Sequence, residues 1–418
     1  MKKELKKFGV TFHQRTLKNG INLFHFERKG MPIYLEAVFF AGSRFDEITG
    51  TAHFLEHMLL AGTQKFPTKN IIADYIQRVG GDFGASTDNN VLRLYVEVPE
   101  AQDIDVGINV LSECLTKSIF DEKTIENEKK VIISELRGKM SNPREYLNEI
   151  RRKIALQGTT ASRSTLGGES DINSITKETI VDYFIKFITS GRVCFVSSGD
   201  IEIENLENKL NLVNLPKDKR FTVEGKLPIY KKTTEGIEFY DKSDQVHASL
   251  VTRTSIENYK EYCALMLLVN VLGLGRGSRL TTKIRYEKGL VYSIFANVFS
   301  TVDWGTLSIT FSCHRDNFEK VRDLIFQEFM ILKNNISDSE LKNTISKISK
   351  GAVSDFQTSK SWVNFHETEA LFTPLELHTV ENYIETIGSI DLKDIKFVID
   401  KYFIPTNFLT AICGNYQK

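Results

Sequence analysis

A chain of 418 residues, 41% hydrophobic and 26% charged, has a globular composition and is too long for one typical hydrophobic core. Lysine plus arginine equals aspartate plus glutamate, at 54 each, so the charge balance does not favour nucleic acid or an acidic membrane surface as a partner. No apolar run approaches the roughly 20 residues that span a bilayer. We therefore expect two or more globular domains and no membrane or nucleic-acid partner.

The N-terminal sequence begins with basic residues, as a signal peptide does, but no apolar segment follows it. It also lacks the arginine- and serine-rich, acid-poor character of a transit peptide. Five cysteines, at positions 114, 194, 263, 313 and 413, are scattered without C-x-x-C spacing, and most lie in apolar runs. This usage is typical of small core side chains in a reducing compartment. We expect a cytoplasmic protein, although a mature chain trimmed of a presequence would look the same.

The first 210 residues alternate strand-like and helix-like segments. The segment 33–40 is nearly all apolar, which predicts a central strand. In chain order we expect strands at 21–26 and 33–40, helices near 51–60 and 70–79, strands at 83–86 and 91–98, helices near 103–117, 121–141, 143–156 and 176–188, and a strand at 192–198.

Residues 211–234 break this pattern with prolines, glycines and lysines, and we interpret them as a linker. After it the same order recurs, which predicts two similar domains, 1–210 and 235–418. The second copy is expected to have strands at 246–253, 291–299, 305–312 and 408–413, and helices at 262–272, 315–333, 337–357, 359–371, 379–387 and 391–402. The predicted class is α+β: two duplicated α/β domains, each a mixed sheet with helices.

The segment His53-Phe54-Leu55-Glu56-His57 carries the strongest chemical signal. On a helix, residues four apart share a face, so His53 and His57 can hold one metal ion while Glu56 lies beside them. Imidazole ligands, an open coordination position and a general base are what a zinc hydrolase needs. The spacing is H-x-x-E-H, the inverse of the commoner H-E-x-x-H motif. The alternative is a helix with two surface histidines and a solvated glutamate.

A catalytic zinc needs a third protein ligand, and the expected helix at 121–141 offers two carboxylates. Glu128 and Glu135 lie seven residues apart, close to two helical turns, so both point the same way. Either one can ligate zinc while the other orients a histidine or a water molecule. An ordinary solvated face remains the alternative, because this helix carries many other charged residues.

The motif at 53–57 lies in a longer segment that resembles the pitrilysin family of metallopeptidases. Gly42-Ser43-Arg44, Glu47, Gly50-Thr51-Ala52, Met58 and Gly62-Thr63 carry the likeness. The resemblance is strongest to the branch with the mitochondrial processing peptidase β subunit and small bacterial peptidases. It implies one Zn²⁺ held by His53, His57 and Glu135, with Glu56 as base and Glu128 as supporting carboxylate. It also implies a clamshell of two similar domains around a chamber, with zinc in the first domain only.

Two further segments match the family. In the family, residues at the positions of Arg285 and Tyr292 reach the substrate from the second domain. From the residues alone, a surface ion pair and a core tyrosine are the favoured explanation. Gly84-Ala85-Ser86-Thr87 resembles the edge strand that binds an extended peptide, main chain to main chain. The family usually carries asparagine where this chain has Gly84. The other six histidines (13, 25, 247, 314, 366 and 378) lack mutual ligand spacing and are interpreted as structural or surface residues.

Taken with the resemblance, these residues predict a zinc-dependent endopeptidase that cleaves unfolded peptides, acting as a homodimer or as a heterodimer with a homologous subunit. One alternative is a catalytic subunit that is active only beside an inactive homologous partner. Another is a structural or assembly subunit that kept the fold and lost catalysis; the intact set His53, Glu56, His57 and Glu135 argues against it. A zinc-binding module unrelated to proteolysis is disfavoured by the segment that contains Arg285 and Tyr292.

Overall fold

The computed structural model describes residues 1–189, 192–214, 235–238, 245–301, 303–372 and 377–416. The chain divides into two compact units, which are considered one at a time. Unit 1 comprises Met1–Arg137, Arg163–Thr222 and Val353–Glu381, and unit 2 comprises Gly138–Ser162, Val223–Ala352 and Asn382–Lys418. The units are therefore interleaved along the sequence.

Unit 1 is built on a mixed sheet of seven strands in the order β1-β2-β3-β7-β4-β6-β5. The pair β3–β7 is parallel and the other neighbours are antiparallel. The strands are β1 (Lys2–Leu5), β2 (Val10–Thr16), β3 (Asn22–Glu27), β4 (Ile33–Phe39), β5 (Asp82–Thr87), β6 (Leu92–Val98) and β7 (Val193–Gly199). Its helices are α1 (Thr51–Ala61), α2 (Lys69–Gln77), α3 (Ile104–Thr116), most of α4 (Glu122–Met140), α6 (Glu169–Ser174), α7 (Lys177–Tyr183), α8 (Ile203–Leu210) and α12 (Ser359–Phe372).

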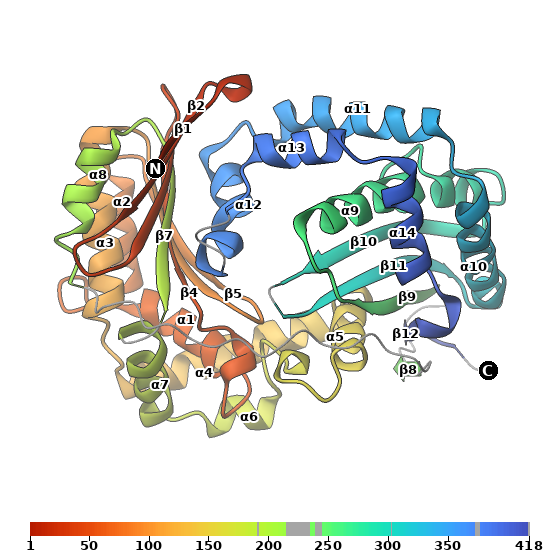
Figure 1. Cartoon of the computed structure of the whole chain (residues 1–418). Coiled ribbons are helices and arrows are strands. Elements are labelled where there is room, and N and C mark those ends of the chain that lie inside the picture. The colour runs from red at the N-terminus through yellow and green to blue at the C-terminus, as the bar shows by residue number, and fades with distance from the viewer. Residues whose placement is uncertain (190–191, 215–234, 239–244, 302, 373–376, 417–418) are drawn as a thin grey trace. The chain divides into compact units, whose positions relative to one another are not determined.

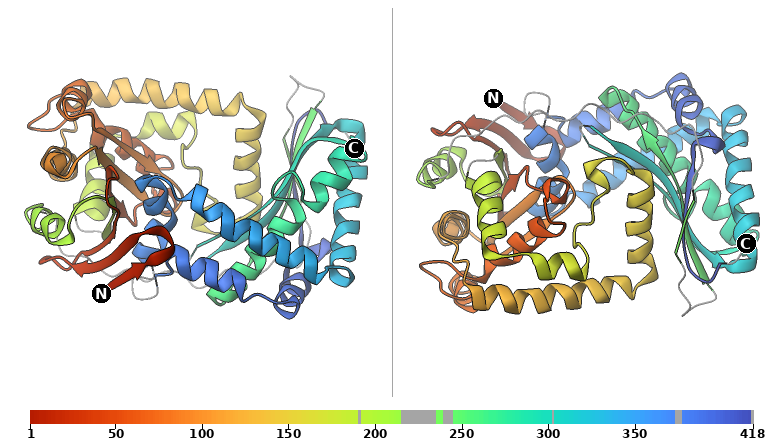
Figure 2. Two further views of the ribbon diagram at one scale, coloured as in Figure 1. Left: turned by 90° about the horizontal axis from the view of Figure 1, so that it is seen from above. Right: turned by 90° about the horizontal axis from the view of Figure 1, so that it is seen from below.

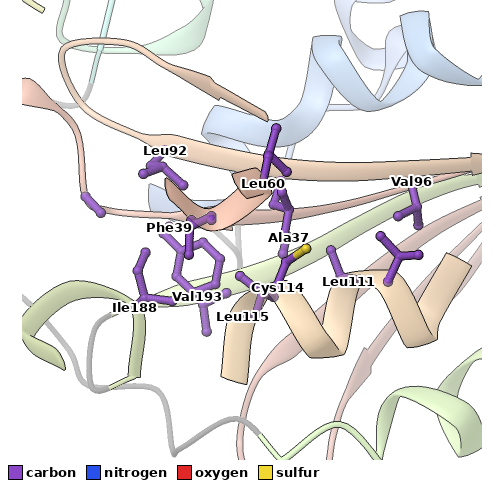
Figure 3. Packing of buried hydrophobic residues seen from close by; sticks show 14 of the residues in the cluster. Ala37, Phe39, Leu60, Leu92, Val96, Leu111, Cys114, Leu115, Ile188 and Val193 are labelled. Carbon is purple, nitrogen blue, oxygen red and sulfur yellow. The ribbon is translucent and has the colours of Figure 1, made fainter. Parts of the chain in front are cut away.

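One face of this sheet forms the hydrophobic core of unit 1. Because side chains alternate along a strand, β4 presents Ala37 and Phe39 to this face. Figure 3 shows them beside Leu111, Cys114 and Leu115 of α3. All seven residues of β4 are buried, which confirms the expected central strand. The same core receives the apolar side of α1, so the H-x-x-E-H helix is anchored in the hydrophobic core of the unit.

The opposite face of the same sheet is covered by α12, a helix from the far end of the sequence. Figures 1 and 2 show α12 across the sheet from α2, α3 and α8. His366 stacks on Phe26 of β3 with ring centroids 4.0 Å apart, and Glu367 pairs with Arg93 of β6 at 2.7 Å. The Ser359 hydroxyl donates a hydrogen bond to the Pro32 carbonyl at 2.5 Å. These contacts place α12 within unit 1.

Unit 2 is built on a five-stranded sheet in the order β10-β11-β9-β12-β8. Only the β12–β8 pair is parallel. The strands are β8 (Glu235–Glu238), β9 (Gln245–Thr254), β10 (Val291–Ser300), β11 (Gly305–His314) and β12 (Leu409–Cys413). The helices are α5 (Pro143–Ala155), α9 (Tyr259–Gly273), α10 (Phe318–Asn334), most of α11 (Asp338–Asp355) and of α13 (Val380–Gly388), and α14 (Leu392–Tyr402).

Helix α5 precedes the linker in sequence but packs on the sheet of unit 2. Leu147 and Ile150 contact Ala411 and Cys413 of β12. The buried Arg253 of β9 donates hydrogen bonds to the carbonyls that end this helix, at 2.6 Å to Ala155 and 2.8 Å to Gln157. Unit 2 thus takes a helix from the first half of the chain, just as unit 1 takes α12 from the second half.

The expected elements correspond closely to those observed, and the predicted α+β class, with two mixed sheets and their helices, is confirmed. The expected helix at 176–188 is α7 followed by a π-helical segment, Phe184–Thr189. The sequence analysis missed β1, β2, α6, α8 and β8. The compact units differ from the contiguous domains 1–210 and 235–418 in the segments 138–162 and 353–381, because α5 and α12 bury their apolar residues on the other half's sheet. Most of the expected linker, 215–234, lies outside the described residues.

The sequence also raised the questions of membrane-spanning helices and of the surroundings of the cysteines. No helix in the described ranges is both long and apolar enough to cross a bilayer. All five cysteines, each a described residue, are buried and outside any disulfide, as expected for core side chains. Burial raises the pKa of the Cys114 and Cys313 thiols to about 12, so both are unreactive at neutral pH.

Candidate active site

Helix α1 presents the H-x-x-E-H motif at the boundary between core and solvent. Eight of its eleven residues are buried, which its apolar composition explains. His53 is only 6% exposed, whereas Glu56 and His57 are partly exposed. The helix therefore fixes one imidazole in the core and leaves the glutamate and the second imidazole within reach of a ligand.

Helix α4 brings a carboxylate to both imidazoles. The Nε2 atoms of His53 and His57 each lie 3.7 Å from Oε2 of Glu135. One ligand atom from each of these three residues lies within 4.8 Å of the others, and no second such group of histidine, cysteine or acidic residues occurs in the described parts of the chain. The predicted third ligand, Glu135, is therefore brought to the two histidines.

The chemistry of these donors fits a zinc ion. Zinc in a catalytic site takes three nitrogen or oxygen ligands and keeps one position open. Bonds of about 2.0–2.1 Å in a tetrahedral site place ligand atoms about 3.4 Å apart. The 3.7 Å separations from Glu135 are close to that value. All three ligand atoms lie within 4.8 Å of one another, so the residues present fit one ion between them.

Glu128 contacts His57 on the ring nitrogen that does not face Glu135. Its Oε2 lies 2.9 Å from Nδ1 of His57, and this contact connects α4 to α1. A proton on Nδ1 donates to this carboxylate and leaves Nε2 directed at Glu135. Carboxylates in this position fix the tautomer and ring orientation of metal-binding histidines. The supporting role that the family resemblance implies for Glu128 stays a prediction, and this contact is the geometry on which it depends.

The local charge at this site is strongly negative. Burial by itself lowers the pKa of His57. Hydrogen bonds to Glu128 and Glu135 and the charge of Glu56 raise this pKa by more than burial lowers it, to about 9. In the absence of a metal, His57 therefore holds a proton at neutral pH. A site that stabilises an extra positive charge on an imidazole also favours a cation in its place.

The backbone on either side of α1 is tied down by buried carboxylates that the sequence analysis missed. Before the helix, Asp46 accepts hydrogen bonds from the N–H groups of Gly50 and Ala52, at 2.7 and 3.0 Å. After it, Glu113 of α3 accepts from the Thr63 hydroxyl at 3.2 Å and from the Lys65 N–H at 3.1 Å. Such side chain to backbone contacts have no fixed sequence spacing, so only the structure reveals them.

The predicted peptide-binding segment, Gly84 to Thr87, lies on β5 at the edge of the seven-stranded sheet. Its described ladder is with β6 alone, where Gly84 is opposite Tyr95. A Cβ atom at Gly84 would stand 2.7 Å from the Tyr95 ring, so the glycine makes room for that tyrosine. Tyr95 is itself held by stacking on Tyr34, with ring centroids 5.0 Å apart.

Arg285 and Tyr292 belong to unit 2. Arg285 is exposed near the end of the segment Thr281–Tyr286, and within the described residues no carboxylate lies in ion-pair distance of it. Tyr292, on the edge strand β10, is 64% exposed. The alternative of a core tyrosine is therefore wrong, and both side chains are available to contact a ligand.

The remaining histidines have structural surroundings. His25 and His366 are fully buried, and burial lowers their pKa values to about 4 and about 3, so both are neutral. His13 pairs with Glu27 at 3.1 Å, and Nδ1 of His247 lies 2.9 Å from the Ser312 hydroxyl. None of these belongs to the metal-ligand group, in agreement with the expectation from their spacing.

Comparison with known proteins shows similarity to one peptidase family along most of the chain. Residues 34–169 match the sequence model described as insulinase (peptidase family M16), which includes both α1 and α4. Residues 174–348 match the model described as peptidase M16 inactive domain. The segment with His53, His57 and Glu135 thus falls in the first match, and Arg285 and Tyr292 fall in the second.

Individual relatives cover nearly the same extent. An uncharacterized zinc protease, YmxG of Bacillus subtilis, is 24% identical over 89% of this chain and 90% of its own length. A probable mitochondrial-processing peptidase subunit beta of Arabidopsis thaliana is 23% identical over 90% of this chain and 73% of its length. Among solved structures, a peptidase M16 inactive domain from Pseudomonas fluorescens has a TM-score of 0.87 at 18% identity, covering 97% of this chain and 99% of that one.

Proposed function

Because this chain belongs to peptidase family M16, the pitrilysin family that its motifs resemble, we propose that it is a zinc-dependent endopeptidase acting on extended, unfolded peptides. The observation that carries this proposal is the convergence of His53, His57 and Glu135 from α1 and α4. Relatives named zinc proteases support zinc as the metal.

In this proposal His53, His57 and Glu135 hold the ion, and Glu128 orients His57. Zinc, when bound, supplies a Lewis acid that polarises the scissile carbonyl and acidifies water. Glu56 acts as the general base, because it lies on the same helix one residue before His57 and is partly exposed. It takes the proton of the attacking water and passes it to the leaving amine.

The peptide is proposed to pair with β5 as an added strand. An edge strand offers unpaired N–H and C=O groups, so it binds any extended main chain and reads sequence only weakly. Residues Gly84 to Thr87 are partly or fully exposed, which supports this role. Folded proteins present few free extended segments, and the substrates are therefore unfolded.

Arg285 and Tyr292 are proposed to contact the substrate. A guanidinium and a phenol can donate hydrogen bonds to a carbonyl or to a developing oxyanion. Their exposure and the match of their segment to the second family model support this assignment. A cytoplasmic location is part of the same proposal, and it is supported by five buried cysteines that form no disulfide.

A second candidate is a catalytic subunit that needs a homologous partner. The Arabidopsis relative is named as a subunit of a processing peptidase, and one matching solved chain comes from complex III2 of Candida albicans. These names describe assemblies of those proteins. The retained His53, Glu56, His57 and Glu135 favour a catalytic rather than a structural role for this chain in any such assembly.

The proposal is tested by incubating the purified chain with a mixture of quenched-fluorescence peptides, with and without a zinc chelator. Glu56→Gln serves as the matched inactive control. Cleavage that chelation abolishes, zinc restores and Glu56→Gln lacks is the expected result. A folded, zinc-loaded chain that cleaves nothing alone would point to a partner subunit, and cleavage that persists in the chelator would contradict zinc dependence.

A further inference from the structure

Helix α1 begins without the usual cap. Its N-cap residue is Gly50, which has a φ of 96° and no side chain to accept a hydrogen bond. A Cβ atom at this position would stand 2.6 Å from the Leu166 carbonyl oxygen, so no capping residue fits here. Other helices use a polar N-cap side chain: Thr68 for α2, Asn142 for α5 and Asp391 for α14. The first turn of α1 therefore needs an acceptor from elsewhere.

Asp46, four residues before Gly50, supplies that acceptor. One carboxylate oxygen accepts from the Gly50 N–H at 2.7 Å, and the other accepts from the Ala52 N–H at 3.0 Å. Asp46 is 1% exposed. A carboxylate at a helix N-terminus satisfies free N–H groups and interacts favourably with the helix dipole. The cap that α1 lacks at Gly50 is thus provided by a buried residue outside the helix.

Asp46 is in turn anchored to surrounding elements. Arg163 donates hydrogen bonds to the backbone carbonyls of Arg44, at 3.0 Å, and of Asp46. The Tyr183 hydroxyl interacts with the Asp46 carboxylate and lies 3.0 Å from the Gly42 carbonyl oxygen. Burial raises the pKa of Asp46 to about 7, while donation from the Gly50 and Ala52 N–H groups lowers it. The carboxylate is therefore fixed on several sides before α1 begins.

The consequence concerns His53, which directly follows Ala52 and is the third residue of α1. Helix ends fray first, because their N–H groups lack partners within the helix. A metal ligand in the first turn loses its position when that turn opens. We infer that Asp46 is a positioning residue for the metal site: it holds the first turn of α1 and thereby sets His53 opposite His57 and Glu135. This inference rests on the proposed function, since it assumes that these three residues bind zinc.

Asp46→Asn is the decisive variant, because the side chain keeps its shape but can accept only one of the two hydrogen bonds. Its NH₂ group faces the second N–H donor, donor against donor. We expect zinc affinity, measured by competition with a chromophoric chelator, to fall about 10- to 100-fold, the range found when partners of metal ligands are removed. Amide hydrogen exchange should speed up at residues 52–54 and not across the rest of unit 1.

Asp391→Ala is the control. Asp391 accepts two backbone N–H bonds through one oxygen, Oδ1, from Lys393 at 2.8 Å and from Asp394 at 3.0 Å, and it caps α14 in unit 2. Asparagine would keep this acceptor, whereas alanine removes the cap, so Asp391→Ala is expected to lower the melting temperature and leave zinc affinity unchanged. If Asp46→Asn fails to fold, Arg163→Met removes the donor to the backbone carbonyls of Arg44 and Asp46 and should weaken zinc binding about fivefold.

The outcomes separate the inference from the function on which it rests. Equal zinc affinity of the wild type and Asp46→Asn would overturn the positioning role and leave the zinc site intact. A wild-type chain that binds no zinc would overturn both. Loss of affinity in Asp46→Asn and in Asp391→Ala alike would show a general effect of stability, and would also overturn the positioning role.

Discussion

Oε2 of Glu128 and Nδ1 of His57 lie 2.9 Å apart, and this contact joins the two helices of the proposed zinc site. Because the carboxylate holds His57 in one tautomer, we expect Glu128→Gln to weaken zinc binding about 10- to 100-fold. Chelator competition measures the effect. Glu126→Gln is the control, since Glu126 lies on the same helix but pairs with Lys129 on the surface. Equal zinc affinities of Glu128→Gln and Glu126→Gln would contradict the supporting role of Glu128.

Replacing Glu56 should separate chemistry from metal binding. Glu56→Gln keeps the size and shape of the side chain but cannot take a proton, so cleavage should fall by at least about 10²–10⁴-fold. Zinc content, measured by atomic absorption, should stay at one ion per chain. Full activity in this variant would refute the assignment of Glu56 as the base.

Replacing Glu135 should have the opposite signature. Its Oε2 lies 3.7 Å from both imidazole nitrogens, and a neutral amide is a much weaker zinc ligand than a carboxylate. Glu135→Gln should lose zinc affinity by more than the roughly 100-fold typical of supporting residues. Ser134→Ala, one position earlier and exposed, is a suitable control. Unchanged metal content in Glu135→Gln would exclude this residue as a ligand.

The raised pKa of His57 predicts how pH acts on the metal-free protein. The folded value of about 9 exceeds the ordinary 6.5, because the carboxylates of Glu128 and Glu135 outweigh burial. Protonated His57 therefore adds stability that is fully present below pH 6.5 and is lost as the pH rises through about 9. Thermal unfolding of the chelator-treated chain should show this decline, and His57→Gln should show less of it.

Zinc affinity should rise with pH, whereas the stability of the metal-free protein should fall. Zinc needs the free Nε2 lone pair of His57, so binding releases the proton that this histidine holds. Apparent affinity should increase up to pH of about 9 and then level off. A proton release of zero at pH 7.5, measured by titration in two buffers of different ionisation enthalpy, would contradict the raised pKa.

The asparagine usual in the family should not be tolerated at Gly84. A Cβ atom there meets the Tyr95 ring at 2.7 Å, so Gly84→Asn should cost about 1–3 kcal/mol of unfolding free energy. Gly277→Asn is the control, because a Cβ at Gly277 meets no atom within 4 Å. Adding Tyr95→Ala to Gly84→Asn should recover part of the loss. Strict additivity of the two substitutions in denaturant unfolding would contradict this account.

The local sequence pattern was enough to predict most of the fold and the placement of the two motif histidines on one face of a helix. His53 and His57 share a face because of helical spacing alone, and β4 is recognisable by its apolar run. Glu128 and Glu135 are different: spacing predicts that they point together, but only tertiary packing decides which one meets Nδ1 of His57. Asp46 had no signal in the sequence, because its partners are backbone N–H groups and not side chains.

Long-range packing is what the sequence analysis could not supply. The strand β1 and the helix α8 are short, and the apolar residues of β1, β2 and α8 are explained only by their packing beside β3 and α3. Likewise, nothing in the sequence of α5 or α12 tells which sheet it will cover. Contiguous domains were the natural prediction, and the reciprocal placement of these two helices is the physical reason that the compact units differ from them.

The late position of α12 in the sequence has a consequence for how the chain acquires its structure during translation. Proteins emerge from the ribosome N-terminus first, and domains begin to fold as they appear. Unit 1 has all of its strands once β7 has emerged, yet the face around Phe26 and Arg93 has no cover until residues 353–381 are made. Nascent chains of this protein therefore leave this face of unit 1 uncovered throughout the synthesis of the second sheet.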